Sequence, residues 1–406
     1  MPADSNTGHD LRAALTLVAV GVCAALHVWK LPPALPALQS QLGLNLVESG
    51  FLLSIVQLGG MLLGLLIGLA AVRIGLRRCV MAGLALLAVA SAAGTRFDTA
   101  GAMMLFRGIE GCGFLMAAMP VPSLLRRLVP PSHLSRIMGL WSCYMPLGTV
   151  IILITGAWVL SVADWQTLWL LLAALTAGML LLAWRWVPAD NAAARAATAQ
   201  GSVAAGPWRM IRQTLGSKAV WLVALTFGMY SAQWIAIIGF LPTIYAAAGI
   251  SGTTAGALTG LVAGANIIGN LAAGQLIHRG LAPHRLIVIG FGTMIACAYA
   301  TFGAGLPAVP QFVAVALLSA VGGLIPATLF VLAIAVAPTP QTTTTTVGWL
   351  QQCSSLGQFV GPPVVAWVVN VTGGWQSTWL ATGAYAAVGI VLALALGRTI
   401  RPAEVC

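Results

Sequence analysis

The sequence predicts an all-α membrane protein with twelve transmembrane helices arranged as two pseudo-symmetric six-helix bundles. Composition, the spacing of apolar runs and an internal repeat lead to that prediction. Of the 406 residues, 59% are hydrophobic and only 7% are charged, whereas soluble proteins carry about 25% charged residues. Because so few charges cannot cover a water-soluble body of this size, we expect the apolar excess to face lipid.

Long apolar runs divide the chain into candidate spans. A helix needs about 20 apolar residues to cross a bilayer. Twelve runs are long enough, and in chain order they cover 11–31, 49–72, 78–96, 100–124, 137–161, 166–187, 217–246, 254–278, 285–305, 310–336, 345–370 and 376–397. The runs predict an N-terminal six-helix bundle over 1–187, a cytoplasmic linker over 188–218 and a C-terminal six-helix bundle over 219–406.

The basic residues fall on one side of these spans. With the N-terminus inside, inner segments collect 16 of the 19 Lys and Arg residues; Lys30 and Arg96 lie outside, and Arg107 lies within a helix. Cytoplasmic loops carry such an excess. We therefore expect a multi-pass protein of a bacterial inner (plasma) membrane with both termini cytoplasmic. The asymmetry also accounts for the net charge of +11 without a nucleic-acid partner.

The two halves of the chain repeat each other. At a shift of 206 residues Leu35-Pro36 falls on Leu241-Pro242 and Arg73 on Arg279, and at 210 Trp165 falls on Trp375. Glycine matches alone would be weak in a chain with 46 glycines, but Trp, Pro and Arg matches are less easily accidental. Parallel repeats of this kind imply an axis along the membrane normal and a site between the halves at mid-depth.

Other function classes find no support in the residues. The seven cysteines are scattered singly and read as small apolar filler, not as disulfides or a metal site. There is no phosphate-binding G-x-x-x-x-G-K-S/T loop, so the energy for any transport should come from a gradient. No intramembrane nucleophile has a base beside it. We therefore predict no enzyme, no cofactor and no metal.

Two motifs resemble those of the major facilitator superfamily. The stretch from Gly68 to Arg78, GLAAVRIGLRR, resembles the family's G-x-x-x-D-R-x-G-R-R loop, with Val72 where Asp is usual. The stretch from Arg107, RGIEGCG, resembles its R-x-x-Q-G-x-G motif, with Glu110 where Gln is usual. The resemblance implies alternating access and a conformational loop made of Gly68, Arg73, Gly75, Arg77 and Arg78.

Shorter stretches resemble the cyanate and nitroimidazole permease branch of that superfamily. They are MPVPS from Met119, MGLWS from Met138, WQTL from Trp165 and GFLP from Gly239. That branch usually has Asn-x-Arg-Pro in its first helix, and the position that aligns with its Arg is Ala25 here. An anion-binding Arg is therefore missing, and cyanate is not carried over as substrate.

Three charges lie at predicted membrane depth: Lys30, Arg107 and Glu110. A charge there costs about 3 kcal/mol or more, so it usually faces a partner or water. Arg107 and Glu110 are three residues apart and thus neighbours on one helical face. Either Glu110 carries protons under the control of Arg107 and the substrate, or the two form a permanent ion pair that orders the fourth helix against the first. The fixed charge of Arg107 would also suit an anionic substrate, so Arg107 is a candidate substrate-binding residue.

The first helix offers two further polar candidates. Lys30 shares a face with His27 and Cys23, and it either binds a substrate anion near the outer mouth of the cavity or snorkels to the outer headgroups. Pro32 and Pro33 should break the helix beside it. His27 either relays protons near neutral pH or is simply hydrogen-bonded.

Aromatic and amide side chains of the second half are the other candidate substrate contacts. Tyr230, Gln233 and Trp234 are spaced along one stripe of the seventh run, and Asn266 lies on the eighth. Tyr144 on the fifth run is a weaker candidate. Residues 286–397 include no Asp, Glu, Lys, Arg or His, so a charged N-terminal wall should face an aromatic and amide C-terminal wall.

These features predict a secondary active transporter for a small organic solute, anionic or partly apolar, that works by alternating access coupled to protons. The expected partners are that solute and the lipid bilayer, and we expect a monomer. Two alternatives stay open: a drug or metabolite efflux antiporter, and a non-transporting membrane sensor of the same fold.

Overall fold

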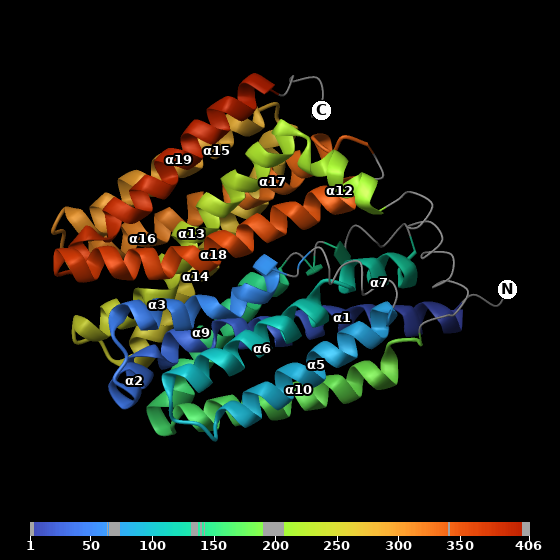
Figure 1. The fold of residues 1–406 in the computed structure, drawn as a ribbon, viewed down its shortest axis with the longest axis horizontal. Coiled ribbons are helices and arrows are strands. Elements are labelled where there is room, and N and C mark those ends of the chain that lie inside the picture. The colour runs from blue at the N-terminus through green and yellow to red at the C-terminus, as the bar shows by residue number, and fades with distance from the viewer. Residues whose placement is uncertain are drawn as a thin grey trace.

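The computed structural model describes residues 4–62, 64, 74–130, 137–138, 140–141, 143–189, 207–339 and 342–399. These residues form helices and the turns that join them, with no strand among them. Figure 1 shows long helices running roughly along one direction, with the start of α1 and the end of α19 toward the same end of the molecule.

Helices account for most of both halves of the chain. Those of the first half are α1 (Asp4–Trp29), α2 (Leu31–Leu42), α3 (Leu46–Ser54), the 3-10 turn η1 (Ile55–Gln57), α5 (Leu76–Gly94), α6 (Ala100–Ala118), α7 (Val121–Leu128), α9 (Tyr144–Val162) and α10 (Trp165–Trp186). Those that follow are α12 (Pro207–Leu215), α13 (Lys218–Ala247), α14 (Gly252–His278), α15 (Pro283–Ala298), the π-helical turn η2 (Tyr299–Gly303), α16 (Ala308–Gly322), α17 (Leu324–Ala335), α18 (Thr343–Thr372), the 3-10 turn η4 (Trp375–Ser377) and α19 (Thr378–Thr399).

Ten helical stretches in the described part of the chain are long and apolar enough to cross a membrane. Each overlaps one of the predicted spans. The predicted span 49–72 is described as an apolar helix only over Leu46–Leu62, and its remainder lies outside the described residues. The span 345–370 is the 30-residue helix α18, whose Gln and Ser side chains lower its hydropathy. The count of twelve spans therefore stays a prediction.

The first span is longer than predicted. The helix breaks at Lys30, as expected from the two prolines, but α2 resumes at Leu31 and continues to Leu42. Pro32 and Pro33 fall in the first turn of α2, where a missing backbone N–H leaves no intrahelical bond unmade. The prediction that the span ends at residue 31 was wrong for this reason. Gly43, with φ +63°, ends α2.

The predicted span 310–336 is two helices, α16 and α17, that meet at Gly323. The backbone of Gly323 lies directly against α14: a Cβ atom there would sit 3.0 Å from the backbone nitrogen of Asn270 and closer still to the backbone carbonyl oxygen of Asn266. Only a residue without a side chain permits this approach. The interruption thus brings α14 close to the polar face described below.

Two pairs of helices make the largest contacts between the first half of the chain and the second, and α2 with α13 makes a smaller one. α14 packs along α9, and α18 packs along α3. Glycines face the neighbouring helix in both pairs, since a Cβ atom on Gly256 would lie 2.5 Å from the carbonyl oxygen of Leu153 and one on Gly50 would lie 2.9 Å from that of Pro362. Glycine at position 256 thus permits the close approach of α14 to α9.

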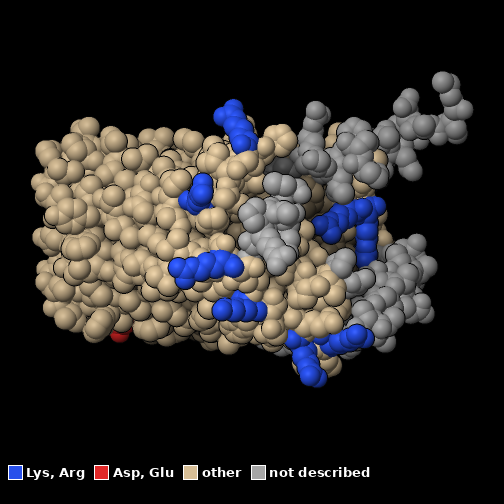
Figure 2. Space-filling model, turned by 90° about the horizontal axis from the view of Figure 1, so that it is seen from above, with Lys and Arg blue, Asp and Glu red and all other residues tan. Residues whose placement is uncertain are grey.

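The exterior of the helices is apolar. Large hydrophobic side chains such as Val162, Val309 and Leu181 are 66–73% exposed, as expected for surfaces that face lipid. Basic residues occupy the last turns of α7, α10, α12 and α19. Figure 2 shows Lys and Arg gathered toward one end of the molecule, which we call the basic end, and the rest of that face nearly free of charge.

Candidate functional site

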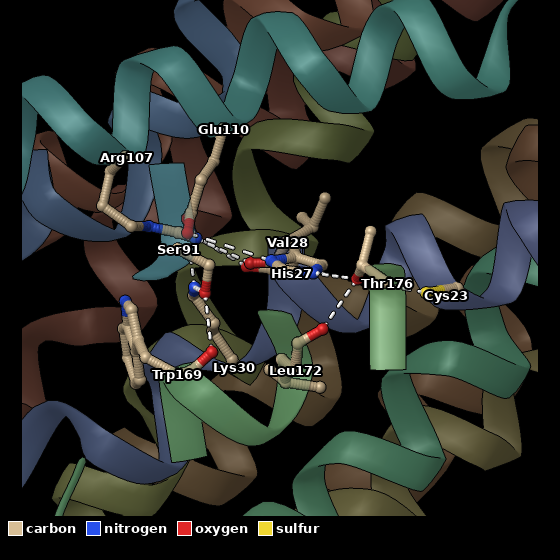
Figure 3. Close-up of polar contacts among 10 residues, drawn as sticks. All are labelled: Cys23, His27, Val28, Lys30, Ser91, Arg107, Glu110, Trp169, Leu172 and Thr176. Atoms are coloured by element: carbon tan, nitrogen blue, oxygen red, sulfur yellow. Dashed lines mark hydrogen bonds and ion pairs between the residues drawn. The ribbon is translucent and has the colours of Figure 1, made fainter. Parts of the chain in front are cut away.

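The polar candidates of the first half lie together beside the break between α1 and α2. His27 comes from the last turn of α1, Lys30 from the break itself, and Arg107 and Glu110 from α6 (Figure 3). All four side chains are at most 1% exposed. The sequence placed Arg107 beside Glu110, and the structure adds Lys30 and His27 to them. We call these four residues the charge cluster.

Arg107 joins α6 to α1. Its Nη1 donates to Glu110 Oε2 at 2.8 Å and to the carbonyl oxygen of His27 at 2.6 Å, and its Nη2 donates to the carbonyl oxygen of Val28 at 3.0 Å. In an unbroken helix the Val28 carbonyl would accept from residue 32, but Pro32 has no N–H to donate. The guanidinium supplies the bond that the proline removes.

Lys30 is surrounded by acceptors. Its Nζ lies 2.5 Å from Glu110 Oε1, 2.8 Å from Ser91 Oγ and 4.3 Å from the centre of the Trp169 ring. The Ser91 hydroxyl donates a hydrogen bond to the carbonyl oxygen of Trp169 at 2.9 Å, so its oxygen accepts from Lys30. The ammonium is fully buried here, and the alternative that Lys30 snorkels to the headgroups does not describe this structure.

The imidazole ring of His27 lies between α10 and α6. Its Nε2 lies 2.7 Å from Thr176 Oγ1, and its Nδ1 lies 3.8 Å from Glu110 Oε1. Thr176 donates to the carbonyl oxygen of Leu172 at 2.7 Å and also contacts Cys23 Sγ at 3.3 Å. The predicted shared face of Cys23, His27 and Lys30 is therefore directed at α10 and α6.

The charges of the cluster do not cancel when His27 is neutral. Lys30 and Arg107 contribute two cations, and Glu110 contributes one carboxylate that binds both. Burying charged groups is costly unless each is paired and hydrogen-bonded. One carboxylate therefore holds together three helical segments, and any change in its partners should be felt by all of them.

The candidates of the second half form a separate polar face. Asn266 donates to the hydroxyl of Tyr230 at 2.9 Å and to the carbonyl oxygen of Ser319 at 2.9 Å. Asn270 donates to the side-chain oxygen of Asn266 at 2.8 Å. Trp234 Nε1 lies 3.2 Å from Ser319 Oγ. These contacts tie α13 and α14 to α16.

Trp234 also connects the two halves. Its ring packs edge-on against Trp29, with centroids 5.2 Å apart and planes at 80°. Trp29 immediately precedes Lys30. The indole nitrogen of Trp29 and both amide atoms of Gln233 are buried and have no hydrogen-bond partner among the described residues. Since buried polar atoms are nearly always paired, these groups are the candidates for contact with a bound solute.

Other predicted site residues lie elsewhere or cannot be placed. Tyr144 stacks on Trp141, with centroids 4.3 Å apart, where α9 passes Gly21 of α1. In the predicted conformational loop, Gly75 has φ +107° and begins α5, and Arg77 Nη2 donates to the carbonyl oxygen of Trp184 at 2.6 Å. Arg78 lies in the first turn of α5. Gly68 and Arg73 lie outside the described residues.

Sequence reasoning missed Ser91, Trp169 and Thr176. Each is an isolated polar or aromatic residue within a long apolar helix, and each reaches the charge cluster only because α5 and α10 pack beside α1. Their one signal in the sequence is a hydroxyl or indole in a run of Ala and Leu. No group of three potential metal ligands exists among the residues that the structure describes.

Known proteins resemble the chain over most of its length. The 2-nitroimidazole transporter of Escherichia coli (strain K12) is 27% identical over 278 residues, which are 65% of this chain and 66% of that protein. The multidrug transporter MdfA of Yersinia pestis bv. Antiqua (strain Angola) is 27% identical over 240 residues, 58% of this chain and 57% of that one. The chain thus spans less than two thirds of the length of these relatives.

The fold is that of known transporters. A bacterial homologue of the human lysosomal transporter Spinster, solved in an inward-facing and unoccupied conformation, superposes with a TM-score of 0.82 at 15% identity, over 96% of this chain and 97% of that one. The sequence profile of the Major Facilitator Superfamily matches residues 17–346 and again residues 223–405. This multi-pass membrane protein therefore belongs to the Major Facilitator Superfamily, whose members are transporters and not enzymes.

Proposed function

We propose that the protein is a proton-coupled secondary transporter of a small, partly apolar organic solute, and that it works by alternating access. The observation that carries the proposal is the fully buried charge cluster at the break in the first span. Ionisable groups inside a membrane are expensive, and they mark substrate pathways and proton relays. Lys30 of this cluster directly follows Trp29 in the sequence, and Trp29 packs against Trp234 of the second half.

We place the solute against Trp29, Gln233 and Trp234 in the conformation in which the two halves separate there and the edge contact of the two indoles opens. Two indole faces suit a flat apolar body, and the unpaired Trp29 N–H and Gln233 amide suit polar atoms at its edge. The name of the 2-nitroimidazole transporter supports a heteroaromatic solute of this kind. Lys30 and Arg107 serve the proton side of the cycle in this proposal, because both are held by Glu110 and both are fully buried.

The domain division and orientation belong to the same proposal. The bundles are residues 1–187 and 219–406, the linker 188–218 is cytoplasmic, and the basic end of Figure 2 faces the cytoplasm. The second match to the family profile begins at residue 223 and the first at residue 17, a separation of 206 residues that equals the offset of the internal repeat. That agreement supports two related bundles.

Flux in proteoliposomes tests the proposal, with 2-nitroimidazole as the first probe. A pH difference between the inside and the outside of the vesicles should drive accumulation or depletion of the probe when the protein is present. Collapse of that pH difference by a protonophore should abolish the driven flux. Glu110→Gln should uncouple the flux from the gradient. Probe movement that is indifferent to an imposed pH gradient would remove the proton coupling.

Efflux is the second candidate direction. The relative named a multidrug transporter favours it. The same vesicles distinguish the two directions, since an antiporter accumulates the probe on the acidic side and a symporter accumulates it on the alkaline side. Probes of different size, tried in parallel, would tell a narrow solute site from a broad one.

A further inference from the structure

The tautomer of His27 is fixed by its neighbours. Thr176 has one hydroxyl proton and donates it to the carbonyl oxygen of Leu172. Its oxygen therefore faces His27 Nε2 as an acceptor at 2.7 Å, and the second lone pair faces Cys23 Sγ at 3.3 Å. In the neutral ring the hydrogen must then be on Nε2, which leaves Nδ1 as a bare acceptor.

The Nδ1 atom of His27 is the one unsatisfied side-chain atom that faces the carboxylate. The residue is fully buried, and Nδ1 has no hydrogen-bond partner among the described residues. It lies 3.8 Å from Glu110 Oε1, beyond hydrogen-bond range, as expected where two acceptors face each other. A proton on Nδ1 would convert this unfavourable contact into a charge-assisted hydrogen bond.

The other members of the cluster already have their protons placed. The three ammonium hydrogens of Lys30 have three acceptors around them, and the guanidinium of Arg107 does not deprotonate in proteins. Glu110 accepts from a cation at each oxygen. Ser91, Trp169 and Thr176, contributed by α5 and α10, do not titrate in this range. α9 also packs on α1, and there it brings Gly148 against Ala25.

We propose that His27 Nδ1 binds the proton of the transport cycle, and that the protonated ring takes Glu110 Oε1 from Lys30. This inference rests on the proposed proton coupling. Protonation would set three buried cations against one carboxylate, and like charges repel strongly where water is excluded. Arg107 is held by two backbone carbonyls, whereas the contacts of Lys30 Nζ among the described residues are with the side chains of Glu110, Ser91 and Trp169 alone. Lys30 is therefore the cation that leaves.

The exchange gives the proton a route to the rest of the protein. Lys30 is covalently next to Trp29, and Trp29 packs on Trp234 of α13. Movement of Lys30 away from Glu110 displaces this edge contact between the halves. His27 thus senses the proton, Glu110 exchanges one cation for another, and the helix break at Lys30 transmits the change to the solute contact.

Nitrogen NMR of histidine-labelled protein in lipid bilayers tests the assignment without any substrate. The chain has five histidines, and His27→Gln identifies the signal of His27, since a Gln amide can still donate to Thr176. We expect a neutral ring with its hydrogen on Nε2 at high pH and a doubly protonated ring on acidification. In Lys30→Met the second proton should bind at a pH higher by about one unit or more, because the competing cation is gone.

Infrared spectra and flux separate the remaining outcomes. A protonated carboxyl band that appears on acidification and disappears in Glu110→Gln, with His27 still neutral, would overturn the inference, as would an unmoved titration of His27 in Lys30→Met. Proton-driven probe flux that survives His27→Gln would overturn it too. His278→Gln, which alters only an exposed histidine at the end of α14, is the matched control. If probe flux by the unaltered protein did not respond to a pH gradient, that result would contradict the proposed function and not the role of His27.

Discussion

At the scale of single residues, the arginine of the charge cluster does two things that no other side chain could do at once. It pairs with Glu110, and it donates to the carbonyl oxygens of His27 and Val28, the second of which has no N–H to accept from because residue 32 is proline. The fork of the guanidinium supplies several donors in fixed directions, whereas an ammonium is a point charge on a flexible stem. Arg107 thus holds α6 against α1, whatever part the charge cluster plays in transport.

Substitution of Arg107 by Lys should therefore destabilise the protein although the charge is kept. We expect a loss of about 2 kcal/mol or more, since at least one buried carbonyl is left without a donor, and about 3–5 kcal/mol for Arg107→Met, which also removes the partner of Glu110. Unfolding monitored in detergent or bilayers measures both. Arg96→Lys, at an exposed position, is the control, and equal stabilities of Arg107→Lys and the unaltered protein would refute the capping role.

Gln233 should behave in the opposite way. Neither of its amide atoms has a partner among the described residues, so Gln233→Leu removes no hydrogen bond from the fold and should leave stability unchanged or raise it by about 1 kcal/mol. If the amide contacts the solute, the same change should raise the KM for the transported probe at least about tenfold. Gln352→Leu is the contrast, because Gln352 Nε2 donates to the carbonyl oxygen of Met61 at 2.7 Å. A stability loss with unaltered KM would assign Gln233 to the scaffold.

The sequence predicted one pair of the cluster and not the rest. Arg107 and Glu110 could be paired because a helix places residues three apart on one face. The partners of Lys30 could not be named, because Glu110 and Ser91 are 80 and 61 residues away along the chain. Their contact depends on how α5 and α6 pack around α1, and helix periodicity contains no information about that.

At the scale of helices, the ends matter as much as the apolar runs. α10 begins at Asp164, whose carboxylate accepts from the backbone N–H of Thr167 at 2.8 Å and from its hydroxyl at 2.6 Å. These hydrogen bonds lower the pKa of Asp164 below its usual value. The cap sets the start of the helix that supplies Trp169 and Thr176 to the charge cluster.

Loss of this cap should destabilise α10 in a pH-dependent way. Because the folded-state pKa of Asp164 is lowered, its contribution is present at neutral pH and is lost as the pH falls through that folded-state value. Asp164→Ala should therefore melt at a lower temperature than the unaltered protein at pH 7, and the difference should shrink in acid. Asp98→Ala, an exposed aspartate outside any helix, is the control. A melting difference that does not depend on pH would contradict the cap.

Helix boundaries show where local sequence rules were too strict. The two prolines predicted the break at Lys30 correctly, but α2 continues beyond them because a first turn tolerates proline. α18 keeps Pro362 and Pro363 inside an assigned helix of 30 residues. The interruption at Gly323 follows Gly322 in the sequence, and its position is set by the backbone of α14 that packs against it.

At the scale of the whole molecule, the halves meet along two seams, the contact of α9 with α14 and that of α3 with α18, and the first of these widens along its length. Along α14, Cβ atoms on Gly256, Gly260 and Gly264 would lie 2.5 Å from Leu153 O, 2.9 Å from Ile154 Cγ1 and 3.3 Å from Val150 Cγ2. Along α3 and the residues after it, a Cβ atom on Gly50 would meet Pro362 at 2.9 Å and one on Gly60 would lie closer still to the Ser355 side chain, whereas one on Gly64 would meet Gln352 only at 3.9 Å.

The seam between α9 and α14 is thus tightest at the end away from the basic end. With the basic end in the cytoplasm, the structure is closed outside and loosens toward the inside. In alternating access the two halves rock so that the seams loosen at one end while they tighten at the other. The glycines at the tight end should therefore be required for the inward-facing state, and side chains placed there should favour the opposite one.

Gly256→Leu should shift the protein toward the outward-open conformation. A Cβ atom at this position meets backbone of α9, which cannot rotate away as a side chain could, so the seam must separate to admit the leucine. Gly274→Leu on the same helix is the matched control, because nothing lies within 4 Å of a Cβ atom there. We expect probe flux to fall at least about tenfold in the first variant and to stay unaltered in the second.

Spin labels report the conformational shift without a substrate. Val162 at the end of α9 and Thr253 at the start of α14 are both exposed at the tight end of the seam, and cysteines there can be labelled once the seven native cysteines are replaced by alanine. The distance between the labels should lengthen in Gly256→Leu and stay unchanged in Gly274→Leu. If Gly256→Leu kept both the short distance between the labels and full probe flux, the seam would have no part in closing the outer side. A contact that tolerates a leucine without moving cannot be the contact that opens during alternating access.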